Sequence, residues 1–508
     1  MASPVAAGVM ALLREAYPVN GLPNWRAEEL KALVMNTATY PLLQPDTGLP
    51  YSLLRAGAGR INPTAALQSS LIAYDAAAPE QVSVSFGNVE VLDKTTTVRE
   101  IQLANKGSTP ISVTVGYTPV RELSGVLIDV DASNVITIAA GGFATLPVTL
   151  TADAATMTRQ PDITRQVIPA NASPWLDEVS GYVIFTPVQA MNGTQNSAIH
   201  VPIHALPRKV SALSLAGEPL ILGNEAATSF ALTVTGTAIS TLPAPTATVP
   251  LLGLFRLAHS SPPISETPVE DDPRLEHFAQ ADLRYVGTAG PVLVDGEPTL
   301  YFVLVTYGPW SSPLEVVFEI QMNTDEDQAI EYQLTNREAT DVSTFDIATS
   351  DEFVSLLESS SSVRTVQGPL NVFPADQYDT RIFDTNVMVM PLRLSELGSG
   401  LSQIQYRVVA FSRDVSSIPQ LGQSGDETPF LALNVAPPAV IEIAPSGVLF
   451  PAAAGNLLVA NVNRAPYLQQ QSQGLLALFL HNNILARTQV LPVEITWPMH
   501  QYLPSIFD

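Results

Sequence analysis

Val82-Ser83-Val84-Ser85-Phe86 and Thr97-Val98-Arg99-Glu100-Ile101-Gln102-Leu103 alternate apolar with polar side chains. Successive side chains of a strand point to opposite faces, so each run predicts a strand with one buried face. A third run of this kind lies at residues 111–115, and turn-forming residues separate it from its neighbours. Short strands at this spacing predict an antiparallel β-sandwich over residues 79–209.

The same signals continue through the rest of the chain. A Pro-rich, acidic segment at 261–274 is typical of a linker or long loop. We therefore expect a β-sandwich region over 210–430 and a C-terminal β domain over 431–508, which makes the chain mainly β with tandem antiparallel β-sandwich domains. The runs that predict strands here are 230–234, 301–305, 314–320 and 405–411, with a final hairpin at 475–480 and 490–493.

The first 75 residues differ, because their apolar side chains recur at helical spacing. Val5, Val9, Leu12 and Leu13 predict one amphipathic helix. A second helix is predicted over residues 24–38, where acidic residues occupy the first turn and apolar residues form a stripe.

Three short motifs occur in this N-terminal segment. They are Met1-Ala2-Ser3-Pro4, Val34-Met35-Asn36-Thr37-Ala38 and Gly57-Ala58-Gly59-Arg60-Ile61-Asn62. In this order they resemble the end of the Gly-Thr-Ser-Met-Ala-x-Pro nucleophile motif, the end of the next helix and the closing Gly-x-Gly stretch of subtilisin-like serine proteases. The resemblance implies that residues 1–75 are the C-terminal remnant of an α/β subtilase peptidase domain.

The resemblance also implies which catalytic groups the chain lacks. The nucleophilic serine would immediately precede Met1, so Met1, Ala2, Ser3 and Pro4 are a remnant of the motif and Ser3 is not the nucleophile. The aspartate, the histidine and the oxyanion-hole asparagine of this family also precede that serine. We expect no catalytic residue in this chain and no peptide-bond hydrolysis by the chain alone. A truncated or frameshifted gene is the favoured explanation, and an independent non-catalytic protein is the alternative.

Residues 79–209 carry a second resemblance. Leu103-Ala104-Asn105-Lys106-Gly107, Ala140-Gly141-Gly142 and Gly181-Tyr182-Val183-Ile184-Phe185-Thr186 resemble parts of the fibronectin type III-like domain that follows the catalytic domain in large cell-envelope subtilases. Such a domain braces the peptidase and can extend the surface that contacts the substrate.

Composition limits the partners and the chemistry. The 508 residues include 48 acidic and 24 basic side chains, a formal net charge of −24, and no cysteine. An acidic chain of this kind argues against a nucleic-acid partner, and the lack of cysteine excludes disulfides and thiol nucleophiles. Protein or peptide substrates of the full-length enzyme and contacts at the cell surface are the partners we expect.

Location follows from the family resemblance. We expect the full-length protein to be secreted or at the cell surface. The chain itself opens without the basic and apolar regions of a signal peptide. The apolar stretch at 440–462 is interrupted by Glu442, two prolines and Asn456, so we do not predict a membrane span.

Few residues suggest metal or catalytic chemistry. His200 and His204 lie four apart in a predicted strand, where they would be about 13 Å apart, too far to share a metal. Asp325 and Asp327 lie in an acidic turn after a predicted strand, and oxygen ligands of this kind suit calcium. The glycine and glutamate of the helical calcium loop are missing, so a solvated acidic turn is the favoured interpretation and calcium the alternative. Asp129, Asp131 and Asn134 form a weaker cluster; the remaining histidines, which lack obvious partners in sequence, are His259, His277, His481 and His500.

Two functions remain open. The first is the C-terminal portion of a secreted subtilisin-like serine endopeptidase. The alternative is a non-catalytic cell-surface adhesion or carbohydrate-binding protein of tandem β-sandwiches, although Trp175, Trp310 and Trp497 are scattered and more typical of sandwich cores. If the first is right, the N-terminal helices lack the sheet they cover, and their apolar stripes should be exposed, poorly packed or docked on the first sandwich.

Overall fold

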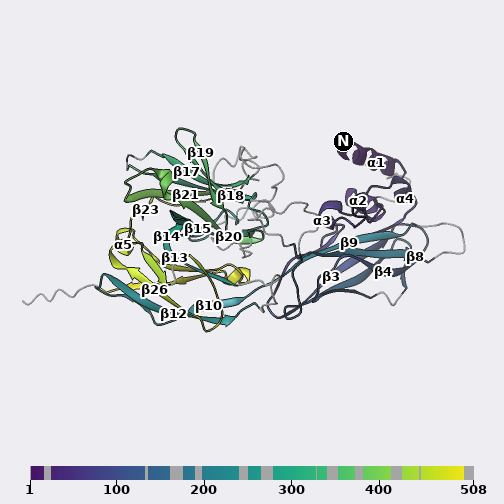
Figure 1. The fold of residues 1–508 in the computed structure, drawn as a ribbon. Coiled ribbons are helices and arrows are strands. Elements are labelled where there is room, and N and C mark those ends of the chain that lie inside the picture. The colour runs from purple at the N-terminus through teal and green to yellow at the C-terminus, as the bar shows by residue number, and fades with distance from the viewer. Residues whose placement is uncertain are drawn as a thin grey trace, which may run out of the picture. The chain divides into compact units, whose positions relative to one another are not determined.

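The computed structural model describes residues 2–16, 25–131, 135–160, 176–188, 197–239, 250–264, 279–325, 327, 329–339, 353–371, 382–412, 426–444 and 448–496. Within them the chain is mainly β, as predicted, and short helices precede the sheets (Figure 1). The chain divides into an N-terminal unit (Met1–Gln166, Pro174–Lys209 and Leu242–Ala247) and a C-terminal unit (Val167–Ser173, Val210–Thr241 and Thr248–Asp508).

The N-terminal unit is a β-sandwich with helices packed on it. Its strands form a four-stranded sheet in the order β1-β3-β7-β5 and a five-stranded sheet in the order β2-β9-β8-β4-β6. Side chains of both sheets meet in one core, which confirms the predicted sandwich architecture. The elements are α1 (Ala2–Ala16), α2 (Ala27–Asn36), α3 (Leu53–Ala56), α4 (Pro63–Leu67), β1 (Leu71–Asp75), β2 (Val84–Val91), β3 (Lys94–Asn105), β4 (Ile111–Arg121), β5 (Val126–Val130), β6 (Ile136–Ile138), β7 (Phe143–Asp153), β8 (Val179–Pro187) and β9 (Ile199–Lys209).

Alternation along β9 separates the two environments of the N-terminal unit. Ile199, Val201 and Ile203 point into the sandwich core. The intervening His200 lies on the opposite face, on the same side as the helical segment that contacts it through Ala58. The strand therefore has one face in the sandwich core and one covered by the N-terminal segment.

The apolar stripes of the helices are docked on the sandwich in part. Val9 and Leu13 of α1 pack with residues of α2 and with Ile72 of β1 in a small buried cluster. Val5 and Leu12 of the same predicted stripe remain 61% and 53% exposed. Only half of the four predicted apolar positions of α1 are therefore buried.

Among the described residues, the C-terminal unit contains two seven-stranded sheets and two smaller ones. Its sheets have the orders β10-β12-β26-β24, β11-β29, β20-β15-β14-β13-β27-β28 with β25 beside β13, and β19-β18-β17-β16-β21-β22 with β23 beside β21. Its first elements are β10 (Ala212–Ala216), β11 (Leu220–Leu222), β12 (Ala227–Thr237), β13 (Leu251–Ser260), β14 (Leu283–Val294), β15 (Glu297–Trp310), β16 (Val316–Asn323), β17 (Tyr332–Glu338), β18 (Phe353–Ser359) and β19 (Arg364–Pro369). The remainder are β20 (Thr385–Arg393), η2 (Leu394–Leu397), β21 (Gln403–Ser412), β22 (Asp426–Glu427), β23 (Leu431–Asn434), β24 (Ile441–Ala444), β25 (Leu449–Pro451), β26 (Leu457–Asn463), α5 (Arg464–Gln469), β27 (Gly474–Phe479), η5 (Ile484–Ala486), β28 (Thr488–Leu491) and β29 (Val493–Ile495).

Strands on both sides of residue 430 share sheets. Residues 227–233 of β12 pair with 457–463 of β26, and residues 252–257 of β13 pair with 474–479 of β27. The predicted final hairpin is present, because β27 pairs with β28 in antiparallel register. The segment after residue 430 thus completes sheets that begin near residue 212.

β13 contributes side chains to three cores of the C-terminal unit. Leu252 and Leu254 pack with the sheet that contains β12. Ala258, further along the same strand, packs with the sheet that contains β16 and β21. Leu251, Phe255 and Leu257 pack in a third core. One strand therefore contributes to all three cores.

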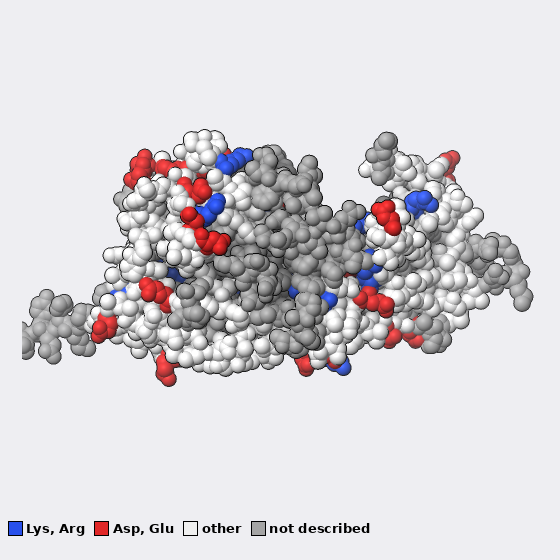
Figure 2. All heavy atoms as spheres, viewed as in Figure 1, with Lys and Arg blue, Asp and Glu red and all other residues white. Residues whose placement is uncertain are grey.

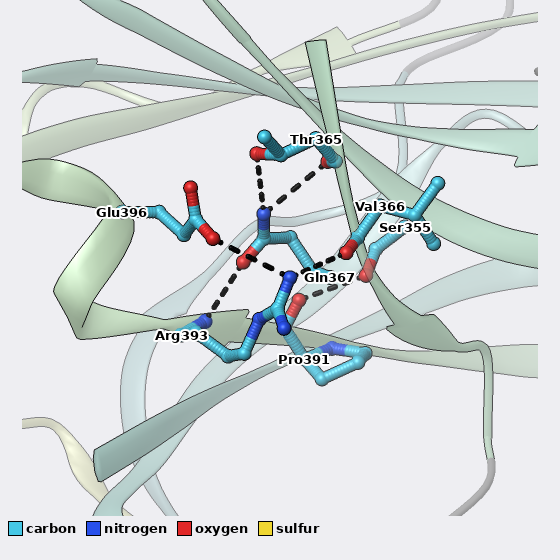
Figure 3. A network of polar contacts seen from close by, with 7 residues as sticks. All are labelled: Ser355, Thr365, Val366, Gln367, Pro391, Arg393 and Glu396. Atoms are coloured by element: carbon cyan, nitrogen blue, oxygen red, sulfur yellow. Dashed lines mark hydrogen bonds and ion pairs between the residues drawn. The ribbon is translucent and has the colours of Figure 1, made fainter. Parts of the chain in front are cut away.

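A polar network joins β20 to the strand pair β18–β19 (Figure 3). The Arg393 guanidinium donates to the Val366 carbonyl at 2.7 Å and forms an ion pair with Glu396 at 3.4 Å. Ser355 donates to the Pro391 carbonyl at 2.8 Å, and the Arg393 backbone amide donates to Gln367 at 3.0 Å. These bonds satisfy polar groups where two sheets meet, so the network is structural.

Charge on the drawn face is dispersed. Figure 2 shows acidic side chains scattered over both units, and the described lysines and arginines on this face form no continuous patch. In the described residues, no helix combines the length and the apolar character that crossing a bilayer requires.

Candidate functional site

The motif remnant lies at the start of α1. Ser3 and Pro4 are exposed in its first turn, while Met1 lies outside the described residues. A Cβ added at Gly8 would meet no atom within 4 Å. Gly8 forms an open face of small side chains together with Ala7 and Ala11, which are also exposed. Such a face permits close approach of a neighbouring element.

The third motif binds the sandwich through its backbone. Gly59 has φ +120°, and a Cβ there would overlap the Thr39 carbonyl oxygen, so only glycine suits this position. The Tyr182 hydroxyl donates to the Gly57 carbonyl at 3.3 Å, and His200 Nε2 lies 2.8 Å from the Ala58 carbonyl oxygen. A carbonyl only accepts, so Nε2 of His200 carries the proton.

His200 is enclosed by aromatic rings. It is 1% exposed, and its ring centroid lies 3.8 Å from that of Tyr40 and 5.1 Å from that of Tyr182. Burial lowers the pKa of His200 to about 4, although the bond to Ala58 opposes this shift. The side chain is therefore neutral near pH 7 and joins the helical segment to β9.

His204 lies in a group that superficially resembles a catalytic triad. It pairs with Ser180 across β8 and β9, and Ser180 donates to Glu178 at 2.7 Å. Burial lowers the pKa of His204, and the Glu178 charge partly opposes this. Because Ser180 donates its proton to Glu178 and not to His204, the serine–histidine hydrogen bond of a catalytic triad is absent from this group. The pairing depends on strand register, so the sequence alone did not indicate this group.

The other histidines and the weaker acidic cluster are dispersed. Burial lowers the pKa of His259, with Asp426 opposing the shift. His481 is buried at 1% exposure, whereas His277 and His500 lie outside the described residues. Asp129 and Asp131 are exposed, and Asn134 also lies outside the described residues.

The structure places the two calcium candidates beside a third carboxylate. Oxygen atoms of Asp325, Asp327 and Glu331 lie within 4.8 Å of one another. Each already accepts a backbone hydrogen bond, from Asp327, Ala329 and Thr324 respectively, at 3.3, 2.8 and 2.8 Å. These bonds account for the turn by itself, and carboxylate oxygens of this number could also bind calcium. The sequence did not indicate Glu331, because the turn before β17 brings it back to Asp325.

The described tryptophans are buried. Trp310 is 1% exposed and donates from Nε1 to the Ile382 carbonyl at 3.2 Å, and Trp25 is 6% exposed. Trp175 and Trp497 lie outside the described residues. Trp25 and Trp310 therefore offer no surface on which a sugar could stack.

Solved structures with some likeness are diverse. A secreted serine protease, VesC from Vibrio cholerae, aligns at 7% identity and TM-score 0.17 over 75% of this chain and 50% of its own. An α-2-macroglobulin segment from Escherichia coli aligns at 13% identity and TM-score 0.18 over 38% of this chain and 24% of its own. A FixG-related protein from Vibrio parahaemolyticus aligns at 14% identity and TM-score 0.14 over 23% of this chain and 81% of its own. TM-scores this low imply nothing further about this chain.

Family-level similarity is confined to the N-terminus. No curated protein matches the chain. The region of similarity, residues 1–88, contains the three motifs and the helices that carry them, and it ends within β2. Residues 1–88 match the model of the subtilase family, Peptidase_S8.

Proposed function

We propose that this chain is the C-terminal portion of a secreted subtilisin-like serine endopeptidase. The full-length enzyme hydrolyses peptide bonds of protein substrates, and the chain alone is inactive. The observation that carries the proposal is the subtilase match over residues 1–88, which opens on the end of the nucleophile motif. The residues that would supply the nucleophile, the general base and the oxyanion hole precede Met1 in this family's chain order.

Packing in the N-terminal unit supports a bracing role for the first sandwich. Lys106, which follows β3, lies 2.9 Å from Glu29 of α2, and this carboxylate also accepts the Arg26 backbone amide at 2.9 Å. Both the ion pair and the contacts to Gly57 and Ala58 hold the helical part of the family-matched residues 1–88 against the sheets. In the full-length enzyme, the sandwich would fix the helix that the nucleophilic serine opens. A fibronectin type III-like identity for this sandwich is part of the same proposal.

The open face of α1 fits this role. Small side chains at Ala7, Gly8 and Ala11 leave room for a sheet to approach the helix closely. Val5 and Leu12, which are more than half exposed, would be covered by the same sheet. Burial of each such side chain stabilises a protein by about 1.5–3 kcal/mol, so the missing sheet would add substantially to stability.

The test compares the chain with its extended reading frame. The chain alone should release no peptides from casein, whereas the frame extended upstream through Gly-Thr-Ser and the two other triad motifs should do so. Replacement of the upstream serine by alanine in the extended protein is the matched control, and it should abolish release. An upstream frame without triad motifs, or an extended protein that is folded and inactive, would overturn the proposal.

A further inference from the structure

A cavity of about 700 Å³ opens in the C-terminal unit, beside β13. Leu254, Leu433, Val440 and Leu449 supply apolar walls. This volume is typical of sites that bind small organic molecules, about 300–1,000 Å³. One acidic and one basic side chain also line it: Glu442, which is exposed, and Arg256 of β13, which is 2% exposed.

Arg256 is unusual because it is buried and, among the described residues, has no acidic partner. Within the described part of the chain, no carboxylate forms an ion pair with it. Its contacts are to neutral oxygens instead: Nε donates to Thr288 at 3.1 Å, and Nη1 donates to the Ala432 carbonyl at 3.1 Å and to Gln470 Oε1 at 2.8 Å. Arg393, in contrast, has Glu396 beside it. Burial of a charge is costly unless an opposite charge or strong hydrogen bonds compensate, so the region around Arg256 favours an anion.

The guanidinium also has donor capacity left among the described residues. Of its five N–H groups, the two on Nη2 make a single contact, to the Tyr406 hydroxyl at 3.5 Å, which is at the outer limit of a hydrogen bond. Burial lowers the pKa of Arg256, and the contact with Tyr406 opposes this. An oxygen anion in the cavity would give the charged guanidinium the opposite charge that it lacks among the described residues.

Further polar groups line the cavity and limit the charge of that anion. Burial, reinforced by the Asp295 charge, raises the pKa of Tyr301 to about 12, so its hydroxyl stays protonated. Glu442 lies exposed at the cavity and accepts a bond from Asn463 at 3.2 Å. One buried cation and one exposed carboxylate favour a ligand with a single negative charge over a dianion.

We propose that this cavity binds an amphipathic monocarboxylate, with the carboxylate on Arg256 and the apolar part against Leu254, Leu433 and Val440. A fatty carboxylate and the C-terminus of a peptide with apolar side chains share this chemistry. A carboxylate suits the guanidinium because hydrogen bonds between two ionised groups are stronger than those between neutral groups. The site is independent of the peptidase proposal, because every residue that forms it belongs to the C-terminal unit.

Calorimetric titration of the whole chain tests the site. Octanoate and octanamide are one pair of probes, and acetyl-leucyl-leucine and its C-terminal amide are the other. At least one carboxylate should bind with a stoichiometry of one and at least tenfold more tightly than its amide. The better carboxylate identifies the source as fatty acid or peptide, and no saturable binding of either, or equal binding of acid and amide, overturns the proposal.

Two variants assign the site without disturbing the core. Leu293 lines the cavity and is 75% exposed, so Leu293→Glu adds a negative charge there with little effect on folding. Leu485, which is 91% exposed and lies outside the cavity lining, gives the matched control Leu485→Glu. We expect Leu293→Glu to weaken carboxylate binding at least fivefold and Leu485→Glu to leave it unchanged. Arg256→Lys should also weaken binding, and equal affinities for the two glutamate variants would overturn the assignment.

Discussion

Asn36, the last residue of α2, donates a hydrogen bond from its side-chain Nδ2 to the carbonyl oxygen of His200 in β9 at 2.9 Å. Its Oδ1 accepts the backbone amide of Ala73 in β1 at 2.8 Å. β1 and β9 belong to different sheets, so one buried amide ties the helix to both layers of the sandwich. The family-matched segment and the sandwich are therefore coupled by specific polar contacts as well as by apolar packing.

Asn36→Ala should destabilise the N-terminal unit strongly. The substitution leaves a buried carbonyl and a buried amide without partners, at a cost of about 1–3 kcal/mol each. Hydrogen exchange followed by mass spectrometry should show faster exchange in β1 and β9. Gln81→Ala, which removes an exposed amide from the same unit, is the control and should leave those rates unchanged. Equal exchange in both variants would show that Asn36 does not couple the layers.

Two glycines should respond to alanine with opposite signs. Gly59→Ala places a Cβ at φ +120° against the Thr39 carbonyl, so we expect a loss of more than about 1 kcal/mol. Gly8 is helical with open space around it, and Gly8→Ala should stabilise α1 by about 0.5–1 kcal/mol because alanine favours the helix. Urea unfolding of the two variants and the parent chain measures both effects. If Gly59→Ala left the free energy of unfolding unchanged, residue 59 would adopt another backbone conformation than the one described.

The stability of the N-terminal unit should fall below neutral pH because of His200. Its pKa is lowered from 6.5 to about 4 on folding, so between these values the unfolded chain binds one more proton than the folded chain. Stability is therefore unaffected above the unfolded pKa and falls by about 1.4 kcal/mol per pH unit below it. His200→Gln keeps a donor for the Ala58 carbonyl but does not titrate. Between about pH 7 and about pH 5, the parent should lose roughly 2 kcal/mol more than this variant in urea unfolding.

His204 and His259 also have lowered pKa values, but they titrate in the parent and in His200→Gln alike. The difference between the two pH curves therefore reports His200. Parallel pH curves for the parent and His200→Gln would contradict the buried, neutral state of this side chain.

The local features of the fold were readable from the sequence, whereas the long-range pairing was not. The run at 97–103 predicted β3 because alternation acts within one strand. The pairing of β12 with β26 depends on residues far apart in the chain, and no local pattern indicates it. The predicted boundary at 430/431 rests on local signals of this kind, while the sheets themselves continue across it.

The same distinction applies to the candidate sites. Asp325 and Asp327 were identified because they lie in one acidic turn, but Glu331 joins them only through the fold. Arg256 did leave a signal, since it is a charged residue within the apolar run Leu251-Leu252-Gly253-Leu254-Phe255-Arg256-Leu257. Its significance depends on the cavity and on Gln470 and Tyr406, which come from distant segments.

The acidic turn should tolerate conversion to amides. In Asp327→Asn the amide oxygen can still accept the Ala329 backbone bond, and the variant removes one of three neighbouring negative charges. Without calcium, we expect this variant to unfold at the same or a slightly higher temperature than the parent. Thermal unfolding in EGTA and in millimolar calcium measures this. A calcium-dependent rise in the parent that Asp327→Asn removes would make the turn a calcium site, and Asp129→Asn is an exposed control.

A leucine at position 8 should affect the chain alone and the enzyme that we propose it completes in different ways. Gly8 lies on the open face of α1, where an added Cβ would meet no atom within 4 Å. Gly8→Leu should therefore leave urea unfolding of the chain within about 0.5 kcal/mol of the parent or stabilise it, because leucine also favours a helix. In the extended enzyme the same leucine would separate the helix from the sheet that packs on it, and casein hydrolysis should fall by at least tenfold. Val98→Leu, a change at an exposed position of β3, is the control and should affect neither protein. An extended enzyme that hydrolyses casein equally well with Gly8→Leu would show that no sheet covers this face of the helix, even if its catalytic serine lies where the family places it.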